Sequence, residues 1–274
     1  MRRLYKFKWK DESLIYNTMA FVNRYKPADP LRDHELYGPE PYDVNFIFPV
    51  SSTLSSDKVR LVPFVPRIHA APYLDGVRGY ESMYEHMPVA LEHPRDFLCS
   101  VELFRRGAGN ILFAIIDLTR PDPDHAEWGG SIAGMIGLLG TDKTHLVTEF
   151  DPVVVLPAFR RTHVGSHAVG VLLRYTLDVA PAGLGLRKVK WVASPHNIAS
   201  NNLARRMGFK LEGVSRWNYT LPRVEGYPKV GKEGREGDTG NGLLGRDSNE
   251  YAICWDDWEN GGRDIVEKAF ARMK

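Results

Sequence analysis

The apolar residues of this chain follow two spacings. Alternating or continuous short runs are typical of strands, and a three-to-four-residue repeat is typical of helices. The strand patterns cover residues 59–65, 111–118, 131–140, 146–156, 187–193, 210–221 and 251–255. The helix patterns cover residues 69–87, 96–105, 166–179, 200–207 and 264–273. The segment TDKTH, which separates two of the strand runs, has turn chemistry and predicts an antiparallel hairpin.

The order of these elements begins with consecutive strands instead of a strict alternation of strand and helix. This order disfavours a Rossmann-type sheet and predicts the α+β (mixed α/β) class. Residues 1–57 are rich in tyrosine, proline and charge, and we expect them to form an N-terminal extension packed on the main domain, residues 58–274. Within that domain, residues 222–247 contain seven glycines and are interpreted as a flexible insertion.

The composition excludes several classes of protein. The 274 residues are 43% hydrophobic and 26% charged with a net charge of +2, which predicts a globular protein without a nucleic-acid partner. The longest mainly apolar run, residues 132–139, is too short to cross a membrane. Two cysteines, Cys99 and Cys254, provide neither a disulfide framework nor a four-thiolate zinc site. The start MRRLYKFKWKDES lacks the apolar stretch of a secretory signal, so we expect a cytoplasmic protein.

A basic loop joins the strand 146–156 to the helix 166–179. Its sequence is FRRTHVGSHA, and it leads into a helix N-terminus, whose free N–H groups and dipole attract anions. Arg160 and Arg161 add positive charge, and Gly165 permits close approach of the backbone. The loop therefore predicts a site for a diphosphate, and coenzyme A carries one.

This loop resembles the pyrophosphate loop of the GNAT superfamily of acyl-CoA transferases, whose pattern is [R/Q]-x-x-G-x-[G/A]. Arg160 and Gly165 match the ends of the pattern, whereas His163 replaces its inner glycine. The same departure occurs in the branch that acetylates ribosomal-protein N-termini. A Cβ at this place narrows the approach to phosphate, so His163 must take an ordinary helical φ.

Other landmarks of the superfamily follow in order, so that the resemblance covers roughly residues 54–221. They are LxxDKVRLVPF at 54–64, the glycine-containing strand IAGMIGL, Glu149 eight residues before Pro157, and NIASNNLARRMGFKLEGVSR at 197–216. The resemblance implies a central mixed, largely antiparallel twisted sheet with flanking helices. It also implies acetyl-CoA as co-substrate and direct attack of a primary amine on the thioester, without a covalent enzyme intermediate.

The resemblance assigns roles to individual positions. Glu149 matches the carboxylate that takes the proton of the amine. A backbone N–H of the strand 153–156, where the family has a bulge, would meet the charge on the thioester oxygen. The expected contacts of coenzyme A are Val153, Val154, Val155, Arg160, Arg161, Thr162, His163, Val164, Gly165, Ser166 and Asn197.

Protonation of the departing thiolate is less clear. Many family members use a tyrosine on the short helix, but the equivalent residue here is Ala204. Ser200, which matches a serine of the N-terminal-acetylating branch, takes its place as the candidate. Simpler interpretations stay open: Ser200 as the N-cap of its helix, and Glu149 as one partner of a salt bridge.

His163 and His167 have the i, i+4 spacing of a zinc pair, but no third ligand stands at a motif spacing, and we expect no metal. The acceptor amine is a small molecule or the N-terminus of a peptide or protein, and the flanking insertion favours a small molecule. A non-catalytic acyl-CoA-binding sensor is the alternative. A nucleotide-phosphate-binding protein is disfavoured because the G-x-x-x-x-G-K-[ST] loop is missing. Both a monomer and a homodimer remain open.

Overall fold

A seven-stranded sheet with the order β1-β2-β3-β4-β5-β7-β6 organises the fold. All neighbouring strands run antiparallel except β4 and β5, which run parallel. This topology confirms the expected mixed, largely antiparallel sheet and the predicted hairpin. The strands are β1 (Val59–Pro63), β2 (Ile111–Asp117), β3 (Ser131–Asp142), β4 (Val147–Val155), β5 (Lys188–Ala193), β6 (Lys210–Leu221) and β7 (Leu244–Cys254).

The coordinates are a computed structural model that describes residues 22–52, 54–240 and 242–272. Residues up to Leu31 form one unit and residues from Arg32 onward form a second, which contains the sheet. No helix in the described ranges has both the length and the apolar character that a membrane crossing requires. The first 21 residues of the expected N-terminal extension lie outside the described residues.

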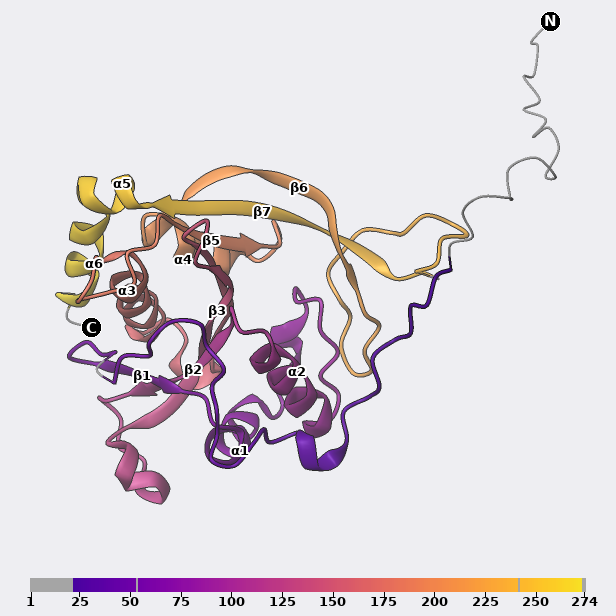
Figure 1. Ribbon diagram of the computed structural model, residues 1–274, viewed down its shortest axis with the longest axis horizontal. Helices are drawn as coiled ribbons and strands as arrows, with labels where there is room; N and C mark the ends of the chain where they lie inside the picture. Colours follow the sequence, from indigo (N-terminus) through magenta and orange to yellow (C-terminus); the bar gives the residue numbers. More distant parts are fainter. Residues whose placement is uncertain (1–21, 53, 241, 273–274) are drawn as a thin grey trace, which may run out of the picture. The chain divides into compact units, whose positions relative to one another are not determined.

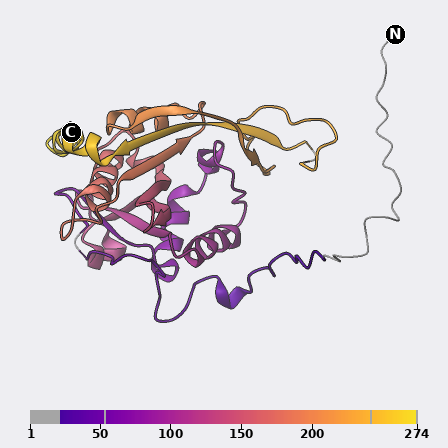
Figure 2. The same ribbon diagram turned by 45° about the horizontal axis from the view of Figure 1, so that its top comes forward.

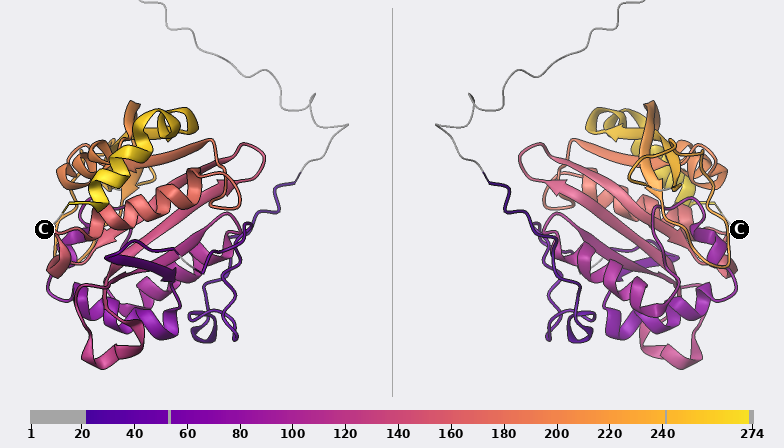
Figure 3. Two further views of the ribbon diagram at one scale, coloured as in Figure 1. Left: turned by 90° about the vertical axis from the view of Figure 1, so that its left-hand side faces the viewer. Right: turned by 90° about the vertical axis from the view of Figure 1, so that its right-hand side faces the viewer.

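Helices cover both faces of the sheet (Figure 1). α1 and α2 contact β3 and β2 on one face, and α3 packs on the other face beside α6 (Figure 3). The ring of Phe113 on β2 meets that of Tyr175 on α3 at a centroid distance of 6.5 Å. The helices are α1 (Pro66–Val77), α2 (Pro94–Arg106), α3 (Val164–Leu177), α4 (Ile198–Arg206), α5 (Trp255–Asp257) and α6 (Arg263–Phe270). Because both faces are covered, β2 is buried along nearly its whole length.

Short helical turns complete the chain between these elements: η1 (Asp33–Glu35), η2 (Glu81–Tyr84), η3 (Pro123–Trp128), η4 (Pro157–Phe159) and η5 (Trp258–Gly262). The predicted helix over 69–87 is wrong at its C-terminal half. It ends at Val77 because Gly79 has a φ of +80°, and η2 follows in place of a continuous helix. The predicted end of the last helix at Met273 lies outside the described residues.

Residues 32–52 are tied to the main domain by hydrogen bonds. The N–H of Ile47 donates to the carbonyl of Ala108 at 2.9 Å, and the Tyr175 hydroxyl donates to the carbonyl of Pro49 at 2.7 Å. These contacts join the segment before β1 to the end of α2 and to α3. The part of the expected extension from residue 32 onward therefore belongs to the same unit as the sheet.

The parallel pairing of β4 and β5 is short, and this determines where the site lies. It covers only Val147–Glu149 opposite Lys188–Lys190, after which the two strands separate. A bulge in β4 falls at Asp151–Pro152, where two residues stand opposite Gly137 of β3. A Cβ on Gly137 would lie 2.7 Å from the Asp151 carbonyl oxygen, so the bulge leaves no room for a side chain there. The bulge was expected within the strand segment 153–156, and it lies just before that segment.

β6 and β7 form a long ribbon that continues past the end of β5 (Figure 2). β7 begins at Leu244, seven residues before its predicted start, and the connection between the two strands therefore covers residues 222–243. Residues 229–232 of this connection, which was interpreted as a flexible insertion, form specific bonds with the rest of the chain. The Lys229 ammonium donates to the carbonyls of Tyr84, Met87 and Val89 at 2.7–3.1 Å.

Candidate functional site

A cleft of about 620 Å³ opens where β4 and β5 separate. Its walls come from the chain around η2, the end of β4, the loop before α3, and α4. Among its lining residues are the predicted cofactor contacts Val153, Val154, Val155, Arg160, Arg161, Thr162, Gly165 and Asn197, together with Ser200, the predicted proton donor. The sequence motifs and the cleft thus coincide at the end of the parallel strand pair.

The other predicted residues do not line this cleft. Val164 is fully buried in the core. The His163 ring faces Asp117 of β2, with 3.1 Å between Nε2 and Oδ1. The Ser166 hydroxyl lies 3.5 Å from a guanidinium nitrogen of Arg206. Glu149 lies at the base of the split, where the strand pairing ends.

The loop before α3 exposes backbone donors. The N–H groups of Arg161, Thr162, His163, Gly165 and Ser166 have no acceptor among the described residues, whereas the Val164 N–H donates to Thr162 Oγ1 at 3.3 Å. These donors stand at the N-terminus of a 14-residue helix, where the helix dipole is positive. The loop can therefore hold a polyanion through its main chain.

Two backbone conformations shape this loop. Arg161 has a φ of +61°, the left-handed region that side-chain-bearing residues seldom occupy, and this turns the chain into the helix. His163 has φ −66° and ψ −23°, so the expectation that it takes a helical φ is confirmed. Since its ring is held by Asp117, His163 fits where the family pattern has glycine.

Three guanidinium groups lie around the cleft. Arg160 and Arg161 are exposed, and Arg160 Nε donates to the Val155 carbonyl at 3.3 Å. Arg206, near the end of α4, is the third. The sequence analysis missed Arg206, although its place on the short helix of the family motif was a signal for it.

Asn197 and Ser200 are set by the start of α4. Asn197 Oδ1 accepts the Ser200 N–H at 3.1 Å, so Asn197 caps the helix and the interpretation of Ser200 as the cap is wrong. Ser200 Oγ accepts the indole N–H of Trp191 at 2.9 Å. Its own O–H remains available to donate toward the cleft. Ala204 is fully buried and takes no part in the cleft.

Glu149 carries a partly satisfied carboxylate. Its side chain is 15% exposed, and Lys190 Nζ lies 3.6 Å from Oε2 across the strand pair. Burial raises the pKa of Glu149, and Lys190 opposes that rise. The ion pair considered as the simpler interpretation is therefore present.

A second carboxylate, Asp151, lies two residues further along β4 and was missed by the sequence analysis. Burial raises its pKa to about 7, and the negative charge of Glu149 adds to the rise. Among the described residues its side chain has no hydrogen-bond or ion-pair partner. Two acidic residues spaced i, i+2 on a strand share a face, which was the available signal.

β7 provides the opposite wall of this polar region. Arg246 is 7% exposed, and its guanidinium donates to the His86 carbonyl at 2.8 Å and to Ser248 Oγ at 3.0 Å. Glu250 accepts a short hydrogen bond from the Ser215 hydroxyl. The charges of Glu149, Asp151 and Arg246 shift one another's pKa values, so the three groups lie near one another, and this group of side chains is called the polar chamber below.

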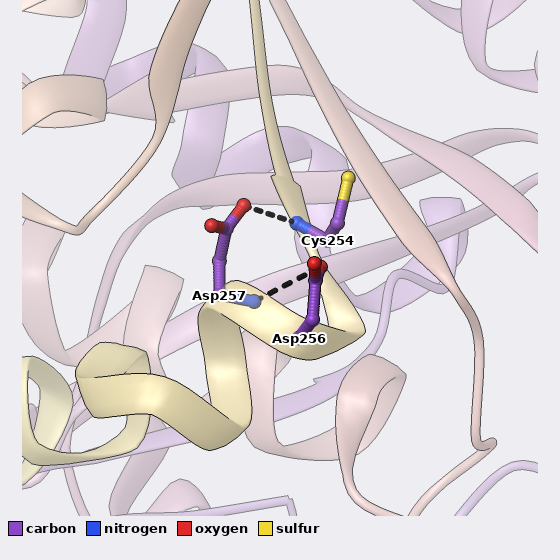
Figure 4. A group of neighbouring side chains, drawn as sticks. All are labelled: Cys254, Asp256 and Asp257. Atoms are coloured by element: carbon purple, nitrogen blue, oxygen red, sulfur yellow. Dashed lines mark hydrogen bonds between the residues drawn. The ribbon is translucent and has the colours of Figure 1, made fainter.

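Two groups of side chains have metal-ligand chemistry. The rings of His163 and His167 are 5.4 Å apart, but they face Asp117 and Ser56 respectively. Cys254, Asp256 and Asp257 lie within 4.8 Å of one another (Figure 4).

The carboxylates of the second group already have partners. Asp257 accepts the Cys254 N–H at 3.1 Å and pairs with Lys210, while Asp256 accepts the Asp257 N–H. These bonds close the turn that begins α5, which accounts for the cluster without a metal.

Comparisons with known proteins agree with this geometry. A model of the acetyltransferase (GNAT) family matches residues 91–209. No curated protein matches the chain. A GCN5-related N-acetyltransferase from Brucella melitensis has a similar structure, with a TM-score of 0.63, 19% identity, and coverage of 81% of this chain and 87% of that one.

Ribosomal-protein acetyltransferases are also among the similar structures. Mycobacterium smegmatis RimJ, in complex with CoA-disulfide, has a TM-score of 0.56 and 16% identity, and covers 77% of this chain and 88% of its own. RimL, an acetyltransferase of ribosomal L7/L12, has a TM-score of 0.53 and 15% identity, and covers 73% and 92%. At these identities the likeness concerns the fold.

The raised pKa of Asp151 predicts a pH-dependent stability. Between pH 3.8, where an ordinary aspartate ionises, and about 7, the native state binds more protons at this site than the unfolded state. The contribution of Asp151 to stability is therefore largest below this range and is lost as the pH rises through it. The melting temperature of Asp151→Asn, measured relative to the wild type, should increase between pH 4 and 7 and then level off. Parallel curves for the two proteins would contradict the assignment.

Proposed function

We propose that the chain is an acetyl-CoA-dependent N-acetyltransferase of the GNAT family, whose model matches residues 91–209, and that it binds acetyl-CoA in the cleft between β4 and β5. The observation that carries this proposal is the row of N–H groups at residues 161–163 and 165–166, which have no acceptor within the described part of the chain. A diphosphate can accept from several of these donors at once while the helix dipole and the nearby guanidinium groups balance its charge.

The remaining parts of the cofactor would follow the cleft inward. Asn197 and Ser200 border it on α4, and Val153–Val155 border it on β4. Beyond Glu149 the edge of β4 that faces β5 has no strand partner. Backbone N–H groups of this edge can donate to the thioester oxygen as it gains negative charge.

The reaction would proceed by direct aminolysis. The acceptor ammonium loses a proton to a carboxylate of β4, for which Glu149 is the family position, and the amine nitrogen attacks the thioester carbonyl. The C–S bond then breaks, and the thiolate takes a proton that Ser200 can relay through its free O–H. Holding the two reactants in one cleft makes the attack effectively intramolecular.

The setting of the site favours a small primary amine over a peptide or protein N-terminus. The connection 222–243 is bonded to the chain around η2, which closes one side of the cleft region. Cys99 and Cys254 are free thiols, which fits a reducing compartment, and we place the protein in the cytoplasm. The site residues impose neither a second copy of the chain nor a nucleic acid.

Binding of acetyl-CoA tests the anion site. Arg160→Ala should weaken binding about tenfold, since one charge-assisted hydrogen bond at an exposed position is lost. Titration calorimetry measures this, with Arg187→Ala, an exposed arginine at the other end of β5, as the matched control. Equal affinity of Arg160→Ala and the control would place the diphosphate elsewhere.

Catalysis is tested by release of free thiol from acetyl-CoA with a panel of primary amines and peptide N-termini. The double variant with Glu149→Gln and Asp151→Asn should lose turnover by about 10²- to 10⁴-fold while its affinity for acetyl-CoA is kept, because the proton acceptors are gone. If no amine raises thiol release above background hydrolysis, the non-catalytic acyl-CoA-binding sensor becomes the better description.

A further inference from the structure

We propose that Asp151, and not Glu149, is the catalytic residue that receives the proton of the acceptor ammonium. The inference rests on the proposed function and assigns one step of it to one side chain. Asp151 lies two residues past the last pair of the β4–β5 ladder, Glu149 with Lys190, and two residues before Val153, which lines the cleft. Its place is therefore between the base of the split and the cofactor wall.

The two carboxylates differ in what already binds them. Glu149 faces the Lys190 ammonium at 3.6 Å, so a positive charge already stands where an ammonium substrate would have to come. Asp151 has no hydrogen-bond or ion-pair partner among the described residues, and it stands in the β4 bulge, which breaks the regular pairing with β3. A half-buried carboxylate without a partner lowers the stability of the folded protein. A cationic ligand would provide the ion-pair partner that the protein lacks.

The charged or titratable groups that act on Asp151 are Glu149 of the same strand, Arg246 of β7 and Tyr219 of β6. Lys190 of β5 and Glu250 of β7 act on Glu149. Opposite the bulge, β3 contributes Gly137, which has no side chain. Glu149 and Asp151 together place two acidic groups beside one buried guanidinium, that of Arg246, whose Nε has no acceptor among the described residues. The chamber can therefore hold a cation without becoming positively charged overall.

The connection 222–243 is bonded to the chain around η2, part of which lines the cleft. Lys229 is 8% exposed and binds three carbonyls around η2, the Val230 N–H donates to the Glu85 carbonyl at 3.1 Å, and Arg246 holds the His86 carbonyl. These bonds fix the wall opposite β4 at the place where Glu85 and His86 reach the cleft. Burial of Asp151 raises its pKa and strengthens the electrostatic interactions of its carboxylate.

The acceptor R–NH₃⁺ gives one proton to the Asp151 carboxylate, and the freed lone pair forms the N–C bond with the thioester carbon. The tetrahedral species collapses with cleavage of the C–S bond, and the second nitrogen proton reaches the thiolate through Ser200. The products are the amide and free coenzyme A, and Asp151 returns its proton to solvent before the next turnover.

The experiment compares Asp151→Asn with Glu149→Gln over pH 5.5–9.5, with acetyl-CoA and ethylamine, a minimal amine that demands little of the acceptor pocket, and with the best amine of the panel. In the wild type we expect an acidic limb in kcat/KM with an apparent pKa of about 7. Asp151→Asn should lose the limb and about 10²- to 10⁴-fold in kcat, with unchanged acetyl-CoA affinity. Glu149→Gln should keep activity within about tenfold and move the limb to lower pH, because a neighbouring negative charge is removed.

Asp247→Asn is the matched control. Asp247 is an aspartate of β7 that pairs with Lys232 and lies outside the chamber, so its loss should leave the limb in place. If Asp151→Asn fails to fold, as judged by circular dichroism and acetyl-CoA binding, Asp151→Glu takes its place. That variant keeps a carboxylate but displaces it by one methylene from its position in the wild type, so it should retain the acidic limb with a lower kcat.

The outcomes separate this inference from the function on which it rests. An active wild type in which Asp151→Asn keeps the limb, or in which Glu149→Gln abolishes it, overturns the assignment and leaves the acetyltransferase function intact. A wild type that releases no thiol with any amine overturns both. An Asp151→Glu variant with wild-type kcat also contradicts the proposal, because a base that must contact the ammonium does not tolerate displacement.

Discussion

The whole site depends on the short parallel contact between β4 and β5. A longer ladder would close the sheet and leave no cleft, whereas three residues on each strand are enough to anchor the two strands and let them part after Glu149. Parallel neighbours need a crossover, and here the crossover is α3. The same connection therefore opens the sheet and places a helix N-terminus, with its free donors, at the mouth of the opening.

The core supports this arrangement from both faces. β2 and β3 are buried between the helix layers, which holds β4 from one side, and Phe150 of β4 packs against Phe209, which in turn meets Trp191 of β5. These aromatic contacts join the strands on the face opposite the acidic chamber. The split can consequently hold partly desolvated carboxylates because apolar packing elsewhere keeps its two sides in position.

Features that depend on neighbouring residues could be predicted from the sequence. Features that depend on contacts between distant parts of the chain could not. The loop Arg160–Gly165 was predicted because charge, a glycine and a helix start all lie within a few residues. The start of β7 was missed because Arg246, Ser248 and Glu250 alternate on a polar chamber, so the strand lacks an apolar signal. Asp151 was missed because the bulge in which it stands arises from pairing with β3. The glycines of 222–243 suggested mobility, yet the three carbonyls bound by Lys229 come from a distant part of the chain.

The bonds of Lys229 join two segments that stand on either side of the family match in the sequence. The family model ends at residue 209, so it contains the diphosphate loop and both β4 carboxylates but neither the chain at 81–87 nor the ribbon of β6 and β7. The segments that Lys229 joins, around residues 81–89 and 222–243, therefore lie outside the part of the chain that the family model matches. If these segments border the acceptor amine, their exchange between related proteins changes which amine is acetylated and leaves the diphosphate loop and the β4 carboxylates as they are.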